Sequence, residues 1–261
     1  VFKNCPSGFS GILICVKIQN YIGKEWCTMK RGKGKADKKA MKFAECKVKK
    51  GKWAAEYDGT IYGGCVVNCD VQNKSYPPFC LTTHMDKTVK NEAMKKYTGE
   101  NRKVMQTAAK VEYDGYCVWT RVQETVEFMK RMGYHKIGIA TCVGLIQETR
   151  ELTKILRSHG FEVYGIGCKV GAVAKTEFGI DVDCQKIGNN SCNPILQAKL
   201  LNAEGTDLNI VMGLCVGHDS MFYKYSDALV TTLVTKDRVT GHNAVAPLHL
   251  ANGYYAKLKE E

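Results

Sequence analysis

The chain has 261 residues, 44% of them hydrophobic, and a formal net charge of +12. This length is enough for one large domain, or two small ones, with a real core. No apolar run approaches the ~20 residues that a membrane span needs, and the apolar patch near the N-terminus lacks a signal-peptide layout. We therefore expect a cytoplasmic protein with no membrane segment.

The positive charge is concentrated in the first half of the chain. Residues 1–135 hold 25 Lys and Arg against 13 Asp and Glu, whereas residues 136–261 hold 13 of each. The simplest interpretation is a solvated, lysine-rich surface. The functional alternative is an acidic protein partner or an anionic ligand held by the basic half. Nucleic acid is disfavoured, because no basic motif with interleaved aromatic residues is present.

The first part of the chain, residues 1–115, is predicted to be an irregular region rich in Cys and Lys. Within it, residues 87–110 have the pattern of a polar helix, or of a helix pair broken near Thr98 and Gly99. Four cysteines form a candidate second metal site, although their spacing lacks the paired CxxC knuckles of a zinc ribbon. They are Cys46, Cys65, Cys69 and Cys80, with His84 as a spare ligand.

The second part, residues 116–261, alternates helices and strands. Amphipathic or capped segments predict helices at 119–132, 145–160, 193–205 and 249–258. Apolar, β-branched runs predict strands at 136–142, 161–168, 208–215 and 228–235. This alternation favours an α/β fold: a parallel, Rossmann-like sheet with helices on both faces and right-handed crossovers.

Four of the thirteen cysteines fall at one edge of that sheet. Cys142, Cys168 and Cys215 come where strands end, and Cys192 opens a helix. Ligands in such folds bind beyond the carboxyl ends of the strands, and thiolates are soft metal ligands. The four cysteines therefore predict an iron–sulfur cluster, preferably [4Fe–4S], with zinc as the alternative. Whether three or four of them bind stays open, and Cys184 is a reserve ligand.

Two ionisable residues near these cysteines are candidate catalytic groups. His218 follows Cys215 closely, and Lys236 follows the last predicted strand. Either could donate a proton to a bound substrate. The alternatives for His218 are to bind the metal or to have a purely structural role in its loop, and Asp219 beside it is expected to cap a helix.

The strings IGIATCVGL, CNPILQAKLLNAEGTDLNIVMGLCVGHDSMF and VTKDRVTGHN resemble an uncharacterised family of cysteine-rich, metal-binding proteins from anaerobic bacteria and archaea. The resemblance covers about residues 115–258. It implies an α/β domain and a cysteine-bound metal, but no reaction. The N-terminal cysteines are spaced more widely here than in that family's compact cluster.

The sequence therefore predicts a cytoplasmic metal-binding protein, with an iron–sulfur cluster as the first choice. Such a centre would suit a redox enzyme or one acting on a small sulfur-containing or anionic substrate. The alternatives are a non-enzymatic zinc protein that binds or senses a partner, and a metal-free α/β module with a reactive thiol at Cys192.

Overall fold

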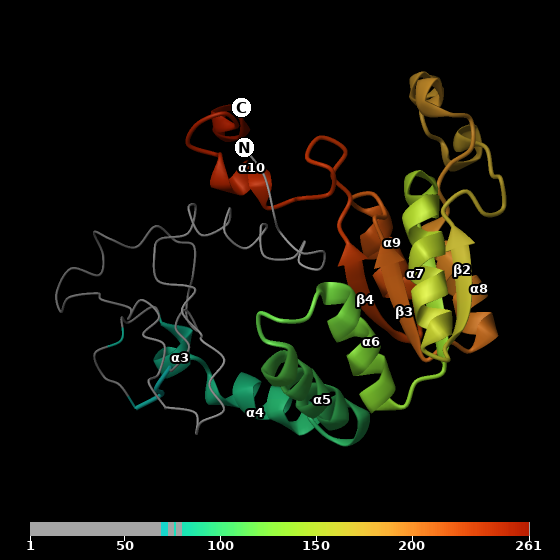
Figure 1. The fold of residues 1–261 in the computed structure, drawn as a ribbon. Helices are drawn as coiled ribbons and strands as arrows, with labels where there is room; N and C mark the ends of the chain where they lie inside the picture. Colours follow the sequence, from blue (N-terminus) through green and yellow to red (C-terminus); the bar gives the residue numbers. More distant parts are fainter. Residues whose placement is uncertain (1–68, 73–75, 77–79, 261) are drawn as a thin grey trace, which may run out of the picture. The chain divides into compact units, whose positions relative to one another are not determined.

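The structure is a computed structural model that describes residues 69–72, 76 and 80–260 (Figure 1). The chain divides into two units, Val1–Asp86 and Lys87–Glu261. In the described part of the first unit, one short helix, α3 (Leu81–His84), begins directly after Cys80. The second unit contains the sheet. The domain boundary expected near residue 115 remains a prediction.

The core of the second unit is a parallel sheet of four strands, β1 (Lys136–Thr141), β2 (Glu162–Gly167), β3 (Leu208–Met212) and β4 (Leu229–Val234). Their order across the sheet is β2-β1-β3-β4. The first strand, β1, is therefore central; β2 forms one edge of the sheet, and β3 and β4 extend it to the other edge. In such an arrangement, the crevice for ligands lies outside the carboxyl ends of β1 and β3.

Helices cover both faces of this sheet (Figure 1). On one face, α6 (Arg121–Met132) and α7 (Ile146–Ser158) share a buried core with the strands. On the other, α8 (Pro194–Glu204) and α9 (His218–Tyr225) share a second core that contains Cys142 and Cys168. The predicted α/β fold with a parallel sheet and helices on both faces is confirmed.

Local sequence signals explain where these helices begin and end. Thr120 and Gln123 form a reciprocal capping box at the start of α6, and Gly133 ends that helix in the left-handed conformation, with φ of 75°. Asn193 caps α8 through the backbone N–H of Leu196, and Gly205 ends it with φ of 66°. These caps fix the ends of the segments that frame the strand termini.

The polar stretch before the sheet forms two helices, α4 (Lys87–Lys96) and α5 (Gly99–Gly115). The predicted break near Thr98 and Gly99 is therefore confirmed. Short 3₁₀ helices also occur, η1 (Val143–Leu145), η2 (Lys175–Phe178) and η3 (Val182–Ile187).

The helix predicted at 249–258 is wrong. The chain forms instead a short α10 (Ala246–His249) and a 3₁₀ turn, η4 (Ala256–Lys259). Asn252 and Gly253 lie between them, and the N–H of Gly253 bonds to the carbonyl of Leu250 in a turn. Asn-Gly pairs favour turns over helix, and here that preference prevails over the apolar spacing.

None of the helices in the described part of the chain has the length and apolar character required to span a bilayer.

Candidate functional site

Three of the predicted site cysteines lie together at the carboxyl edge of the sheet. Cys142 follows β1, Cys168 follows β2, and Cys192 lies two residues before α8. The Cys168 sulfur is within hydrogen-bonding reach of both the Cys142 and the Cys192 sulfurs. Cys142 and Cys168 are buried, at 7% and 2% exposed, and Cys192 packs partly buried against the same core. We call this group the thiol cluster.

Backbone groups hold the thiol cluster from two sides. The N–H of Val143 donates to Cys168 Sγ at 3.3 Å, and the N–H of Gly144 donates to the Cys142 sulfur. The N–H of Asn193 donates to the Cys168 carbonyl at 2.8 Å, which places the start of α8 beside the end of β2. The cluster is therefore fixed by the strand ends and by the first turns that follow them.

The three thiols differ in protonation. Hydrogen bonding from Cys168 lowers the pKa of Cys142 to about 4, assisted by the Gly144 N–H and the charge of Lys236. The same partner lowers the pKa of Cys192 to about 5, assisted by Lys169 and His218. The pKa of Cys168 is raised, because its proton is held between the two neighbouring sulfurs. The lowered pKa values of Cys142 and Cys192 favour their thiolate forms, which are the forms that bind metals.

Cys215, the fourth predicted ligand, follows β3 and is held by an arginine. Arg238 Nη2 donates to Cys215 Sγ at 3.0 Å. The pKa of Arg238 is raised, first by this bond and then by electrostatic interactions with Cys215, Cys142 and Cys192. All four predicted cysteines therefore lie at one edge, with Arg238 electrostatically coupled to three of them.

Both predicted catalytic residues also lie at this edge. Lys236 helps to lower the pKa of Cys142. The two side chains lie near each other beside Gly144, since a Cβ added there would come 3.8 Å from Lys236 Nζ and 3.9 Å from Cys142 Sγ. His218, the first residue of α9, acts electrostatically on Cys192. The expected N-cap role of Asp219 is wrong: Gly217 is the N-cap of α9, no side chain caps this helix, and Asp219 lies in its first turn, where its carboxylate accepts from the N–H groups of Gly217 and Ser220.

Two polar atoms at this edge are buried without a hydrogen-bond partner in the described part of the chain, Gln197 Oε1 and His218 Nδ1. Gln197 is fully buried on α8, and its Nε2 donates to the carbonyls of Thr141, at 3.2 Å, and Ile166, at 2.7 Å. Thr141 directly precedes Cys142, and Ile166 lies two residues before Cys168. Unpaired buried polar atoms are costly, so their presence beside the thiols is consistent with a site completed by a bound group.

Some predicted ligands do not join this arrangement. Cys184 is exposed in η3, where its carbonyl accepts from the buried Lys175 Nζ at 2.5 Å. Cys46 and Cys65 lie outside the described residues. Cys69 is half-buried and Cys80 is buried, and His84 Nδ1 lies 2.7 Å from the Thr83 hydroxyl. The second metal site therefore stays a prediction.

No set of three or more Cys, His, Asp or Glu within residues 69–72, 76 and 80–260 already has the arrangement of a metal site. Cys142 and Cys192 nevertheless lie close enough to Cys168 to raise the pKa of its thiol, so the three side chains are neighbours. The thiol cluster is thus a gathering of potential ligands rather than a preformed coordination shell.

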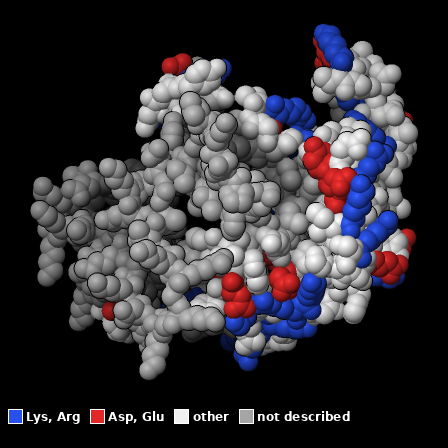
Figure 2. Space-filling model, viewed as in Figure 1, with Lys and Arg blue, Asp and Glu red and all other residues white. Residues whose placement is uncertain are grey.

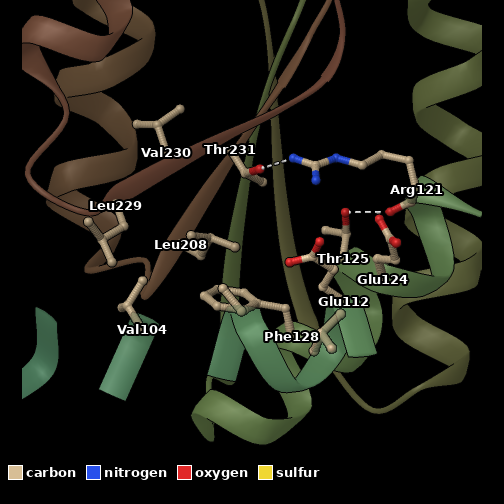
Figure 3. Close-up of a pocket in the computed structure, with 12 residues that line it drawn as sticks. Val104, Glu112, Arg121, Glu124, Thr125, Phe128, Leu208, Leu229, Val230 and Thr231 are labelled. Carbon is tan, nitrogen blue, oxygen red and sulfur yellow. Dashed lines mark hydrogen bonds between the residues drawn. The ribbon is translucent and has the colours of Figure 1, made fainter. Parts of the chain in front are cut away.

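A large hollow lies at the other end of the strands (Figure 3). It measures about 470 Å³ and is lined mainly by apolar residues of α5, α6 and the first residues of β3 and β4. Arg121 crosses it to the Thr231 hydroxyl at 2.9 Å. Neither Cys nor His lines it, so we assign the chemistry to the thiol edge.

Two residues of the site escape prediction from the sequence. Lys169 directly follows Cys168, so its proximity to the thiols could have been inferred from the strand end alone. Gln197 gives a weaker signal: it is a polar residue within the otherwise apolar run that packs α8 on the sheet, beside Ala198 and Leu201.

Comparison with known proteins adds a family but no activity. The model of a family described as "Protein of unknown function (DUF1847)" matches residues 80–233, which include the thiol cluster and Cys215 but not Lys236 or Arg238. An uncharacterized protein of Methanocaldococcus jannaschii is 46% identical over 158 residues, which cover 60% of this chain and 80% of the relative. No solved structure matches the chain.

Proposed function

The chain belongs to the DUF1847 family of proteins of unknown function, and we propose that it holds a thiolate-bound metal centre, an iron–sulfur cluster first of all, at the carboxyl edge of its sheet. One observation carries the proposal. The sulfurs of Cys142, Cys168 and Cys192 come from three separate chain segments and meet, with Cys215 at the same edge.

The donor set fits such a group chemically. Thiolates are the usual ligands of iron–sulfur clusters and of structural zinc. Lys169, Lys236 and Arg238 bring three positive charges to the sulfurs, and these would offset the negative charge of a thiolate-bound centre. The two unpartnered polar atoms, Gln197 Oε1 and His218 Nδ1, also favour a site completed by a bound group.

Two features favour an iron–sulfur cluster over a single zinc ion. Backbone N–H groups donate to the sulfurs of Cys168 and Cys142, and such bonds are a recognised means of tuning cluster potential. Cys215 contacts Arg238 rather than joining the thiol cluster, so the four sulfurs do not already converge on one point as tetrahedral zinc requires.

Each residue has a distinct role in this proposal. Cys142, Cys168 and Cys192 would hold the group. Cys215 would bind as the fourth ligand on release from Arg238, or stay with Arg238 and leave one position for a substrate. Bound there, a cluster would supply electron transfer or a Lewis-acidic iron. The side-chain nitrogens of Lys236 and His218 would then orient a small anionic or sulfur-containing substrate or donate a proton to it.

Anaerobic purification with iron, sulfide and zinc analysis and a visible spectrum tests the proposal. We expect brown protein with iron and acid-labile sulfide, and loss of both in Cys142→Ser, Cys168→Ser and Cys192→Ser. Cys117→Ser and Cys184→Ser are matched controls, because both thiols are exposed and away from the cluster. Stoichiometric zinc in colourless protein would support the non-enzymatic zinc alternative, and metal-free protein after reconstitution would refute both.

Two broader expectations remain part of the proposal. A cytoplasmic location suits the many reduced cysteines that a thiolate-bound centre needs. An acidic protein or anionic ligand at the basic N-terminal half is supported by the charge of that half alone.

A further inference from the structure

A second site lies on the other face of the sheet, and we propose that it binds a phosphate-bearing small molecule. A hollow of about 420 Å³ runs between α7 and the edge strand β2. Its lining includes three basic side chains of α7, Arg150, Lys154 and Arg157, and two glycines of β2, Gly165 and Gly167. This volume is within the usual range for small-ligand pockets, about 300–1,000 Å³.

The three basic residues form a row along the hollow. Steps of four and three residues place Arg150, Lys154 and Arg157 on one side of the helix, over about 10 Å at about 1.5 Å per residue. Figure 2 shows Lys and Arg side chains gathered along α7. The row is therefore long enough to meet more than one anionic group.

The two arginines of this row have no carboxylate partner within the described part of the chain. Arg150 donates to the side-chain oxygen of Gln147 at 3.1 Å, and Arg157 donates to the Val163 carbonyl at 3.4 Å. Lys154 pairs with Glu151 at 2.7 Å, with both side chains largely exposed. An exposed pair of this kind is weak, so Lys154 remains able to bind an anion in the hollow.

The glycines of β2 have no explanation within the chain itself. Neither has a positive φ, a Cβ at Gly165 would meet no atom within 4 Å, and one at Gly167 would meet only Ile146 Cδ1 at 4.0 Å. Glycine weakens a strand, and in strands it often marks a place where a ligand approaches closely. Two such positions facing the basic row indicate a ligand that lies flat against β2.

The chemistry of the row selects phosphate. The arginine fork matches phosphate oxygens in pairs, and lysine adds a point charge. The hydroxyls of Thr149 and Thr153 already donate to backbone carbonyls at 2.7 Å and 2.8 Å, so recognition falls to the three cations. We assign the site to a small molecule with a di- or triphosphate, whose remaining part rests on Gly165 and Gly167.

This site is independent of the metal proposal. The hollow includes Thr141 and Val163, on the face covered by α6 and α7, whereas Cys142 and Cys168 belong to the core under α8 and α9. A failure of the phosphate-binding proposal would therefore leave the metal-binding proposal standing, and the reverse also holds.

Titration calorimetry on the full chain, with ADP and inorganic pyrophosphate at low ionic strength, tests the assignment. We expect both probes to bind. The double variant Arg150→Gln/Lys154→Gln should weaken the binding of both probes by about a hundredfold, because each of the two lost charge-assisted bonds contributes about tenfold. Lys199→Gln/Lys224→Gln is the matched control: it also removes two charges, from exposed positions on α8 and α9, and it should leave both affinities unchanged.

Gly165→Val provides the second test. Its Cβ enters open space, and valine favours strands, so the variant should melt no lower than the parent chain. It should nevertheless lower the affinity for ADP by about tenfold or more, and the affinity for pyrophosphate by less. The reason is that the non-phosphate part of ADP rests on the strand, whereas pyrophosphate has no such part. Gly165→Ala serves if the valine variant unfolds. No binding of either probe at millimolar concentration, or equal affinities in the double variant, would overturn the assignment.

Discussion

Gln197 holds together the two strand ends from which Cys142 and Cys168 emerge. Its side-chain nitrogen donates to the carbonyls of Thr141 and Ile166, on the neighbouring strands β1 and β2. We predict that Gln197→Met, which keeps the length of the side chain and removes its polar atoms, destabilises the unit Lys87–Glu261 and disturbs the thiol cluster above it.

The expected size of this effect follows from the contacts of Gln197. Two buried carbonyls lose a donor, at about 1.5 kcal/mol each, or about 3 kcal/mol together. Removing the unpartnered Oε1 relieves about 1 kcal/mol. The net loss is about 2 kcal/mol, which corresponds to about 4–8 °C in Tm for a unit of this size.

Thermal and urea unfolding of the full chain, followed by circular dichroism, measure this loss. Gln147→Met is the matched control, because Gln147 is exposed on α7, and it should stay within about 0.5 kcal/mol of the parent chain. A Gln197→Met midpoint equal to that of the parent would refute the bridging role, since it would mean that both carbonyls do without the amide at no cost.

Three further changes test the packing, the caps and the charges. Gly138→Ala should cost about 2–3 kcal/mol in urea unfolding, because its Cβ would overlap the buried Asn209 Oδ1; an unchanged midpoint would contradict this close packing. Thr120→Ala should cost about 1 kcal/mol by removing the capping box of α6, and stability equal to the parent chain would argue against the cap. Burial and the charge of Glu100 raise the pKa of Tyr134 to about 12. The stability that this tyrosine contributes is therefore complete below pH 10 and is lost as the pH rises through 12. Tyr134→Phe should flatten that decline, and an ultraviolet titration of the variant should show one tyrosine fewer among those that ionise only near pH 12.

The sequence predicts most of the sheet because each strand carries its own local signal. β1 and β3 are short apolar runs with turn residues after them, and the helices end at glycines such as Gly133 and Gly205 that adopt positive φ. Placing Cys142 and Cys168 at one edge needed only the rule that parallel strands end on the same side.

The remaining site features depend on contacts between distant residues. The bond between Arg238 and Cys215 joins residues 23 positions apart, and the bridge from Gln197 reaches across 56 and 31 positions. Nothing in the local pattern specifies these partners. The wrongly predicted helix at 249–258 shows the opposite limitation, because the turn-forming Asn-Gly pair there prevails over a local apolar spacing that favours a helix.

The segment between β2 and α8 has a consequence for how this protein can vary. It leaves the sheet at Cys168 and returns at Cys192, and its two ends are tied by the bond from the Asn193 N–H to the Cys168 carbonyl and by that from Lys169 Nζ to the Asn190 carbonyl. With its base closed in this way, the excursion can be lengthened, shortened or replaced without separating the two thiols. Doubling the length of such a loop adds only about 0.6 kcal/mol of closure entropy. This segment, which contains η2 and η3, is therefore a suitable place to insert a tag or a reporter while the two thiols keep their positions.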